Sequence, residues 1–90
     1  MENVLNIKSR KNDNVYHVFD EKIVVTIGAK TKDIALPFDS SKPCYYERFS
    51  DVYYINDRLY AIVIVRDSYD VRFEIDEEEL VLKGRPIPTY

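Results

Sequence analysis

The sequence has no tryptophan, one cysteine, one histidine and two glycines among its 90 residues. With one cysteine and one histidine, a single chain cannot build a zinc site from two histidines or from a Cys-x-x-Cys pair. The two glycines, Gly28 and Gly84, lie far apart, which excludes a glycine-rich phosphate-binding loop. The acidic residues between 67 and 79 lack the Asp-x-Asp-x-Asp-Gly spacing of a calcium loop. We therefore expect neither a metal nor a cofactor.

Long apolar runs are also missing. The longest one, Leu59–Val65, has seven residues, far fewer than the ~20 that cross a bilayer. Residues Met1–Asn6 do not combine a basic region with an apolar one, as a signal peptide does. The lone Cys44 cannot form an internal disulfide, which is typical of a protein in a reducing compartment. We expect a cytoplasmic protein that does not enter a membrane.

The chain has no excess of positive charge. Its 13 Lys and Arg residues face 16 Asp and Glu residues, for a net charge of −3, whereas nucleic-acid-binding domains usually carry a basic stripe. Nucleic-acid binding is therefore not expected. A small barrel that stacks bases on its aromatic rings, with help from Lys8, Arg10 and Lys11, is the alternative function that the sequence leaves open.

No cluster of residues typical of an enzyme is visible. The one conceivable pair of nucleophile and base is Cys44 with His17. His17 lies inside a predicted strand and Cys44 follows a proline-containing loop, so nothing in the sequence brings the two together. We predict a protein that is not an enzyme, with a Cys/His hydrolase as a remote alternative.

The strongest structural signal is the apolar run Leu59–Val65. It is rich in β-branched residues and is bounded by Asp57-Arg58 and by Arg66–Ser68, which favours a strand. Alternate residues are apolar on both sides of this strand, as is typical of a strand covered on two faces. The patterns of Val52–Ile55 and Tyr69–Ile75 predict that it is the middle strand of an antiparallel meander.

The N-terminal half contains three shorter patterns typical of strands: Val4–Lys8, Val15–Phe19 and Lys22–Ile27. Only Asp20-Glu21 separates the last two, which predicts a tight hairpin. The next segment, Ala29–Asp33, is polar. Ile34–Phe38 is apolar but interrupted by Pro37, so we expect an edge strand or an ordered loop there.

Two segments, 41–49 and 77–83, fit both a helical turn and a strand. The loop Asp39–Pro43 could also start a single helical turn, because Ser41 can cap it and Pro43 is tolerated in its first turn. Asp76 with Glu79 fits a capping box, whereas Leu80–Leu82 fits a closing strand. For the second segment we predict a single turn followed by a short strand.

These patterns predict one all-β domain over residues 1–90. An antiparallel meander that curls into a partly open barrel or packs as a two-layer sandwich would cover both faces of the central strand. The alternative is an α+β fold with a short helix near 77–83. The prolines of residues 85–90 predict an extended C-terminal tail. Ile87 and Tyr90 in this tail could pack on the sheet or support a homodimer.

Tyrosine is unusually frequent, with eight residues. Its ring is apolar and its hydroxyl group tolerates water, so it suits both cores and protein interfaces. Adjacent Tyr53 and Tyr54 face opposite sides of a strand, and the sequence does not say which of them is outside. Residues 46–90 hold six Lys or Arg and ten Asp or Glu, for a net charge of −4.

We therefore predict a non-catalytic protein-binding module, or a small inhibitor, that uses an acidic, tyrosine-rich surface. Such a surface suits a protein partner with a basic surface. The candidate interface residues are Tyr45, Tyr46, Tyr53, Tyr54, Arg58, Asp70 and Glu74.

Overall fold

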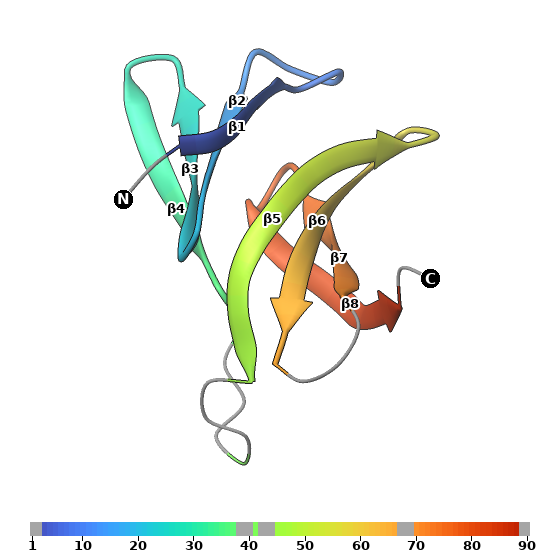
Figure 1. Cartoon of the computed structure of the whole chain (residues 1–90). Coiled ribbons are helices and arrows are strands. Elements are labelled where there is room, and N and C mark those ends of the chain that lie inside the picture. The colour runs from blue at the N-terminus through green and yellow to red at the C-terminus, as the bar shows by residue number, and fades with distance from the viewer. Residues whose placement is uncertain (1–2, 38–40, 42–44, 67–69, 89–90) are drawn as a thin grey trace.

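The computed structural model describes residues 3–37, 41, 45–66 and 70–88, in which there are eight strands and no helix (Figure 1). The strands are β1 (Asn3–Lys8), β2 (Val15–Phe19), β3 (Lys22–Ile27), β4 (Lys30–Ala35), β5 (Tyr46–Ile55), β6 (Arg58–Val65), β7 (Val71–Asp76) and β8 (Val81–Pro88). The first four form one antiparallel sheet in sequence order, and the last four form a second. The all-β prediction is confirmed, and the two meanders pack as two layers. The α+β alternative, with a helix near 77–83, is wrong.

Alternating burial along the strands builds a core between the two sheets. In the first sheet Val18 and Val25 are fully buried, while their sequence neighbours on the other face remain partly exposed. In the second sheet Val63 and Phe49 are fully buried. The hairpin predicted around Asp20-Glu21 is present, with Val18 paired to Ile23.

The fourth strand begins earlier than the sequence predicted. Residues Lys30–Asp33, which we expected to precede the edge strand, belong to it, because Gly28 and Ala29 close a tight hairpin and Ile27 pairs with Lys30. Gly28 has a φ of +60°, which a glycine adopts without strain. Polar side chains are tolerated because Ile34 alone of this strand is buried.

The central strand β6 is covered by the first sheet on one face only. Leu59, Ala61 and Val63 face the core and are at most 1% exposed. On the opposite face Ile62 is buried between side chains of neighbouring strands, but Tyr60 and Ile64 are half-buried. Our expectation of two covered faces was too strong, because two layers leave the outer side of each sheet open.

Strand β5 links the two layers. The ten-residue strand pairs with β6 along its length, and its register shifts twice, between Tyr46 and Arg48 and between Phe49 and Asp51. Such bulges bend a strand, and Figure 1 shows the resulting curve of β5 across the molecule. The backbone N–H of Phe49 donates a hydrogen bond of 2.8 Å to the carbonyl of Asp20, in the turn between β2 and β3 of the first sheet.

The turn between β7 and β8 explains the helix-like pattern of the sequence. One carboxylate oxygen of Asp76 accepts the backbone N–H groups of Glu78 and Glu79 at 2.9 and 3.0 Å, and these bonds lower the pKa of Asp76. Leu80 then adopts a φ of +58°, which ends the turn. The predicted single turn followed by a strand is confirmed.

Residues 85–88, predicted as part of the tail, continue edge strand β8 as far as Pro88, and Ile87 pairs with Arg72 of β7. Prolines are tolerated at an edge because one side of the strand needs no donor. The described part of segment 41–49 is a strand from Tyr46 onward. Most of the loop 39–43, Cys44, Tyr69 and Tyr90 lie outside the described residues.

Candidate functional site

Three of the predicted interface residues, Tyr53, Arg58 and Glu74, lie together on the side of the second sheet that faces away from the first. Tyr53 is opposite Tyr60, and Tyr60 is opposite Glu74. The two oxygens of Glu74 form ion pairs with Arg58 Nη1 at 3.8 Å and with Lys83 Nζ at 3.3 Å. The carboxylate of Glu74 is therefore balanced by two cations.

We call this surface the outer face of the second sheet. It contains residues from all four strands: Tyr53, Arg58, Tyr60, Ile62, Ile64, Arg72, Glu74, Lys83 and Ile87. The guanidinium of Arg72 lies over the ring of Tyr60, 5.4 Å from its centroid, and its Nε atom is buried with no hydrogen-bond partner in the described part of the chain. Ile87 is 42% exposed. Rings and isoleucines occupy this face between charged side chains.

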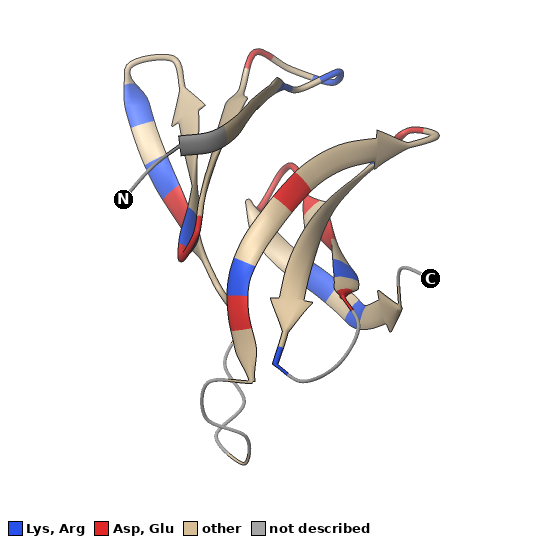
Figure 2. Cartoon of the chain, in the orientation of Figure 1, with Lys and Arg blue, Asp and Glu red and all other residues tan. Residues whose placement is uncertain are grey.

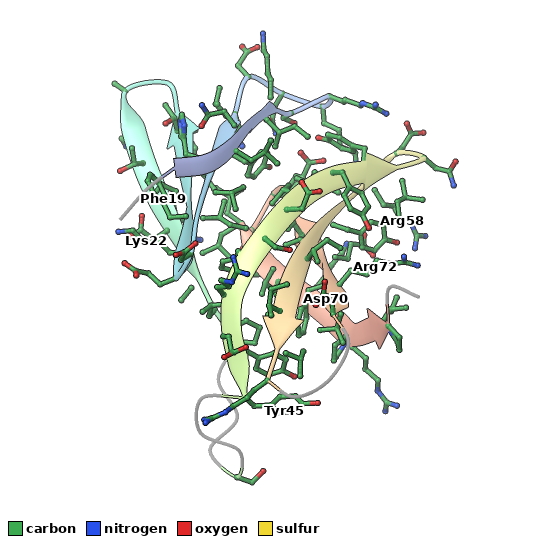
Figure 3. All side chains as sticks on the ribbon, in the orientation of Figure 1. Phe19, Lys22, Tyr45, Arg58, Asp70 and Arg72 are labelled. Atoms are coloured by element: carbon green, nitrogen blue, oxygen red, sulfur yellow. The ribbon has the colours of Figure 1, made fainter. Side chains whose placement is uncertain are left out.

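Tyr45 and Tyr46 lie elsewhere, whereas Asp70 comes just before β7, two residues before Arg72 of the outer face. Tyr46 packs edge-on against Tyr45 and against the core residue Phe73, with centroid distances of 5.0 and 5.7 Å. Tyr45 and Tyr46 are at the start of β5, whereas Tyr53 is near its end, and Figure 3 shows Tyr45 far from Arg58. The structure therefore does not gather all seven predicted residues into one site.

Tyr54 points inward and joins a buried group of polar side chains. We call Ser9, Tyr16, Tyr54 and Glu77 the buried polar cluster. The hydroxyl groups of Ser9, Tyr54 and Tyr16 donate to one oxygen of Glu77, its Oε1, at 2.7, 2.8 and 3.1 Å. Ser9 and Tyr16 come from the first sheet or its loop, and Tyr54 and Glu77 from the second. The cluster therefore joins the two layers through hydrogen bonds.

The pKa values of the two tyrosine hydroxyl groups in this cluster are raised. Burial is the main reason that the pKa of Tyr16 is raised above its ordinary value of 10.0, and the nearby negative charge of Glu77 raises it further. Burial likewise raises the pKa of Tyr54. Both hydroxyl groups therefore keep their protons at neutral pH and can donate them to Glu77 Oε1.

The second oxygen of Glu77, Oε2, has no comparable partner. It is buried, and no donor in the described part of the chain reaches it; the nearest cation is Lys11, whose Nζ is 4.0 Å away. Glu77 lines a pocket of about 240 Å³ at this end of the sandwich. The pocket is also lined by Lys11, Arg58, Leu59, Glu74, Ile75, Asp76, Glu78 and Lys83.

The sequence placed Glu77 only at the start of the ambiguous segment 77–83, and the cluster was not predicted. The sequence feature that could have indicated it is the alternation of inward and outward side chains, extended two residues beyond the inward-facing positions of the strand. Phe73 and Ile75 face the core, so residue 77 is on the same side, and Ser9 follows Ile7 in the same way. We did not expect Glu77 to be buried because charged side chains are rarely buried unless they are paired, and the sequence did not show its partners.

The acidic residues do not form one surface. Glu77 is buried, Glu74 is paired on the outer face, and Glu78 and Glu79 are exposed in the turn. Figure 2 shows positions of both signs on the second sheet. The described residues contain no group of three or more His, Cys, Asp or Glu that could hold a metal ion.

His17 lies on the outer face of the first sheet. Its ring nitrogens contact Asn6 Oδ1 at 2.8 Å and Thr26 Oγ1 at 3.1 Å. Both nitrogens therefore have polar neighbours on this sheet. The remote alternative of a Cys44–His17 pair has one member, Cys44, outside the described residues.

Comparisons with known proteins add no identity. No family model matches the chain, and no curated protein and no solved structure matches it either. Among the residues that the structure describes, there is no helix of the length and apolar character needed to span a bilayer.

A second, larger pocket of about 430 Å³ opens between edge strands β4 and β8. Its apolar lining includes the core residues Ile34, Phe73 and Leu80. Lys32 lies at this pocket, and its Nζ donates to the carbonyl of Glu79 at 2.7 Å. This contact ties the first sheet to the turn of the second.

Proposed function

We propose that this chain is a non-catalytic protein-binding domain, and that its contact surface is the outer face of the second sheet. The observation that carries the proposal is the pairing of Tyr53 with Tyr60 on an uncovered sheet face, with Arg72 stacked on Tyr60. Tyrosine and arginine are among the residue types that contribute most to protein interfaces. An Arg72 already ordered against a ring also loses little conformational entropy on binding.

The arrangement of apolar and charged groups supports the same proposal. Ile62 and Ile64 lie in the middle strand of this face, while Arg58, Glu74 and Lys83 surround the tyrosines. An apolar centre with a polar margin is the usual anatomy of a protein interface. Because the charges here have both signs, we propose that the rings supply most of the binding free energy and that the charges orient the partner.

Nucleic-acid binding, the alternative, receives less support from the geometry. It relied on the aromatic rings together with Lys8, Arg10 and Lys11. The guanidinium of Arg10 already covers the ring of Tyr54 at 4.7 Å from its centroid, and the Tyr54 hydroxyl is bonded to Glu77. That ring is thus engaged within the protein, so it is not free to stack on a base.

Affinity capture from the source cell tests the proposal. The wild-type chain should capture a protein that Tyr60→Ala fails to capture and Tyr60→Phe retains in part, because the ring supplies the contact. Ile87→Ala and Ile27→Ala form a matched pair, since these isoleucines are 42% and 38% exposed on the second and the first sheet. Only Ile87→Ala should weaken binding of the purified partner.

Two results would count against the proposal. One is a partner whose affinity is unchanged by Tyr60→Ala and by Ile87→Ala. The other is an affinity for single-stranded oligonucleotides that falls steeply with salt, because such a slope is the signature of phosphate contacts.

A further inference from the structure

The buried carboxylate of Glu77 is satisfied on one side only. Its Oε1 accepts three hydroxyl groups, whereas its Oε2 accepts none from the described residues. The side chain is 5% exposed. A buried carboxylate oxygen without a donor is unfavourable, so a site of this kind favours the arrival of a donor, above all a cationic one.

The other lining carboxylates of the 240 Å³ pocket are differently placed. Glu74 is held by Arg58 and Lys83. Asp76 accepts two backbone N–H groups of its own turn, and Glu78 is exposed to solvent. Among these four lining residues, Glu77 is thus the one with a buried oxygen, Oε2, to which the described residues supply no hydrogen bond.

Lys11 partly neutralises Glu77 but does not bond to it. Its Nζ is 4.0 Å from Oε2, beyond hydrogen-bond distance, and its side chain is 56% exposed. Its backbone N–H donates to Ser9 Oγ at 3.0 Å, which fixes the start of the side chain beside the cluster. A long, solvent-exposed lysine in this place can move aside at little energetic cost.

We propose that this pocket is a socket for the guanidinium group of an arginine side chain supplied by a protein partner. The inference rests on the proposed function, and it specifies the chemistry of the basic partner. A guanidinium presents several N–H donors in one plane, so it can donate to Glu77 Oε2 and to a second acceptor of the pocket together. The entering group displaces the Lys11 ammonium, since Oε2 itself is closed to solvent.

The position of the pocket fits this role. Arg58, Glu74 and Lys83 line it and also belong to the outer face of the second sheet. A partner seated on the tyrosines of that face therefore has the pocket at its margin. An arginine reaching from the partner around the end of the sheet would meet Glu77 there.

The test uses small probes and no partner. N-acetyl-arginine methylamide, titrated into the ¹⁵N-labelled full chain, should shift the backbone signals of residues 9–11 and 77–78 with a millimolar dissociation constant. The citrulline analogue, which has the same shape without the charge, should bind about tenfold more weakly or not at all. The lysine analogue should also bind more weakly, because it lacks the planar fork.

Three variants define the site. Glu77→Gln should abolish the shifts, whereas Glu79→Gln, an equal change of charge in the same turn but outside the pocket, should leave them intact. Lys11→Ala should strengthen binding about threefold or more, because it removes the competing cation. The dispersion of each spectrum reports whether the variant is folded, and Lys11→Ala keeps the test informative if Glu77→Gln unfolds.

The inference is overturned if the arginine probe binds neither the wild type nor Lys11→Ala. Equal binding of the citrulline or lysine analogue overturns it as well, as does unchanged binding to a folded Glu77→Gln. Failure of the probe leaves partner capture through Tyr60 unaffected, and loss of capture leaves the probe result unaffected. The two proposals can therefore fail separately.

Discussion

The outer faces of the two sheets differ in the side chains that accompany their polar groups. On the first sheet, His17 bonds to Asn6 and Thr26, and Lys22 pairs with Asp33 at 3.3 Å. These residues satisfy one another across neighbouring strands, as expected of a face that meets water. On the second sheet Arg58, Glu74 and Lys83 are also paired across strands, but the rings of Tyr53 and Tyr60 lie beside them.

Two sheets of one small domain therefore need not have equivalent surfaces. Both sheets share one core, and both alternate buried and open residues. Both sheets carry apolar residues at outer positions, but the first sheet has Val15, Phe19 and Val24 there, whereas the second sheet sets Ile62 and Ile64 of β6 beside Tyr60 and Tyr53. A sheet needs no such residues to be stable if its other face is covered, so their presence favours a binding role.

The largest expected effect concerns the shared core. Val63→Asp should abolish cooperative unfolding, because the side chain is 0% exposed and an unpaired buried carboxylate costs several kcal/mol on top of the lost apolar burial. Val81→Asp is the matched control, since Val81 of the edge strand is 45% exposed. Thermal melts of both variants check this, and similar melting temperatures would show that the assigned inner and outer positions of the second sheet are wrong.

The second prediction addresses the contrast between the outer faces directly. Tyr60→Ala should weaken binding of a purified partner by roughly 2 kcal/mol, or about 30-fold in dissociation constant, through faster dissociation. Val24→Ala, on the outer face of the first sheet, should change the affinity little. Binding kinetics measure both variants. If Val24→Ala had the larger effect, the binding surface would belong to the first sheet.

The third prediction concerns the buried polar cluster that joins the sheets. The pKa of Tyr16 is higher in the folded chain than its ordinary value of 10.0, so the folded state holds this proton more tightly than the unfolded state. The stability that this provides is complete below pH 10 and is lost as the pH rises above it. Tyr16→Phe should lower the free energy of unfolding by about 1 kcal/mol at pH 7, because one hydrogen bond is lost. Without the Tyr16 proton, the stability of this variant should also fall less steeply above pH 10.

Urea unfolding of the wild type and Tyr16→Phe at pH 7, 9 and 11 checks the sign of this effect. The difference in stability between the two proteins should shrink between pH 9 and 11. A difference that stays constant would mean that ionisation of Tyr16 is not linked to folding.

The comparison also shows what the sequence can predict. Strict alternation in Val71–Asp76 and the apolar run of β6 were enough to place the second sheet, because side chains alternate with a period of two residues. We predicted the start of the polar strand β4 too far along the chain. Backbone pairing with β3 stabilises its first residues, and such pairing cannot be recognised from side-chain polarity. Leu80 ended the helix-like turn through a backbone conformation that its residue type does not announce.

The candidate site was harder to predict than the fold. Tyr53 and Tyr54 differ only in register, and the pairing of Tyr54 with the buried Leu59 decides that Tyr54 points inward. Glu77 was missed because its partners Ser9 and Tyr16 are more than 60 residues away in the chain. Such contacts depend on how the two sheets pack, and no local pattern encodes that.

The smallest expected effect concerns the charges around the tyrosines. Glu74→Lys and Asp70→Lys should leave folding nearly unchanged, because ion pairs near a surface contribute little. With a basic partner, both changes should slow association by a few-fold and flatten its dependence on salt, since charges at the margin of an interface act mainly on the encounter. Glu74→Lys should have the larger effect, because it also leaves Arg58 and Lys83 without their shared carboxylate.

Association rates measured across a salt series separate this effect from that of Tyr60→Ala, which should change the dissociation rate instead. An association rate that increased in both variants would mean that the partner surface is acidic, and that the tyrosine face attracts it through Arg58, Arg72 and Lys83.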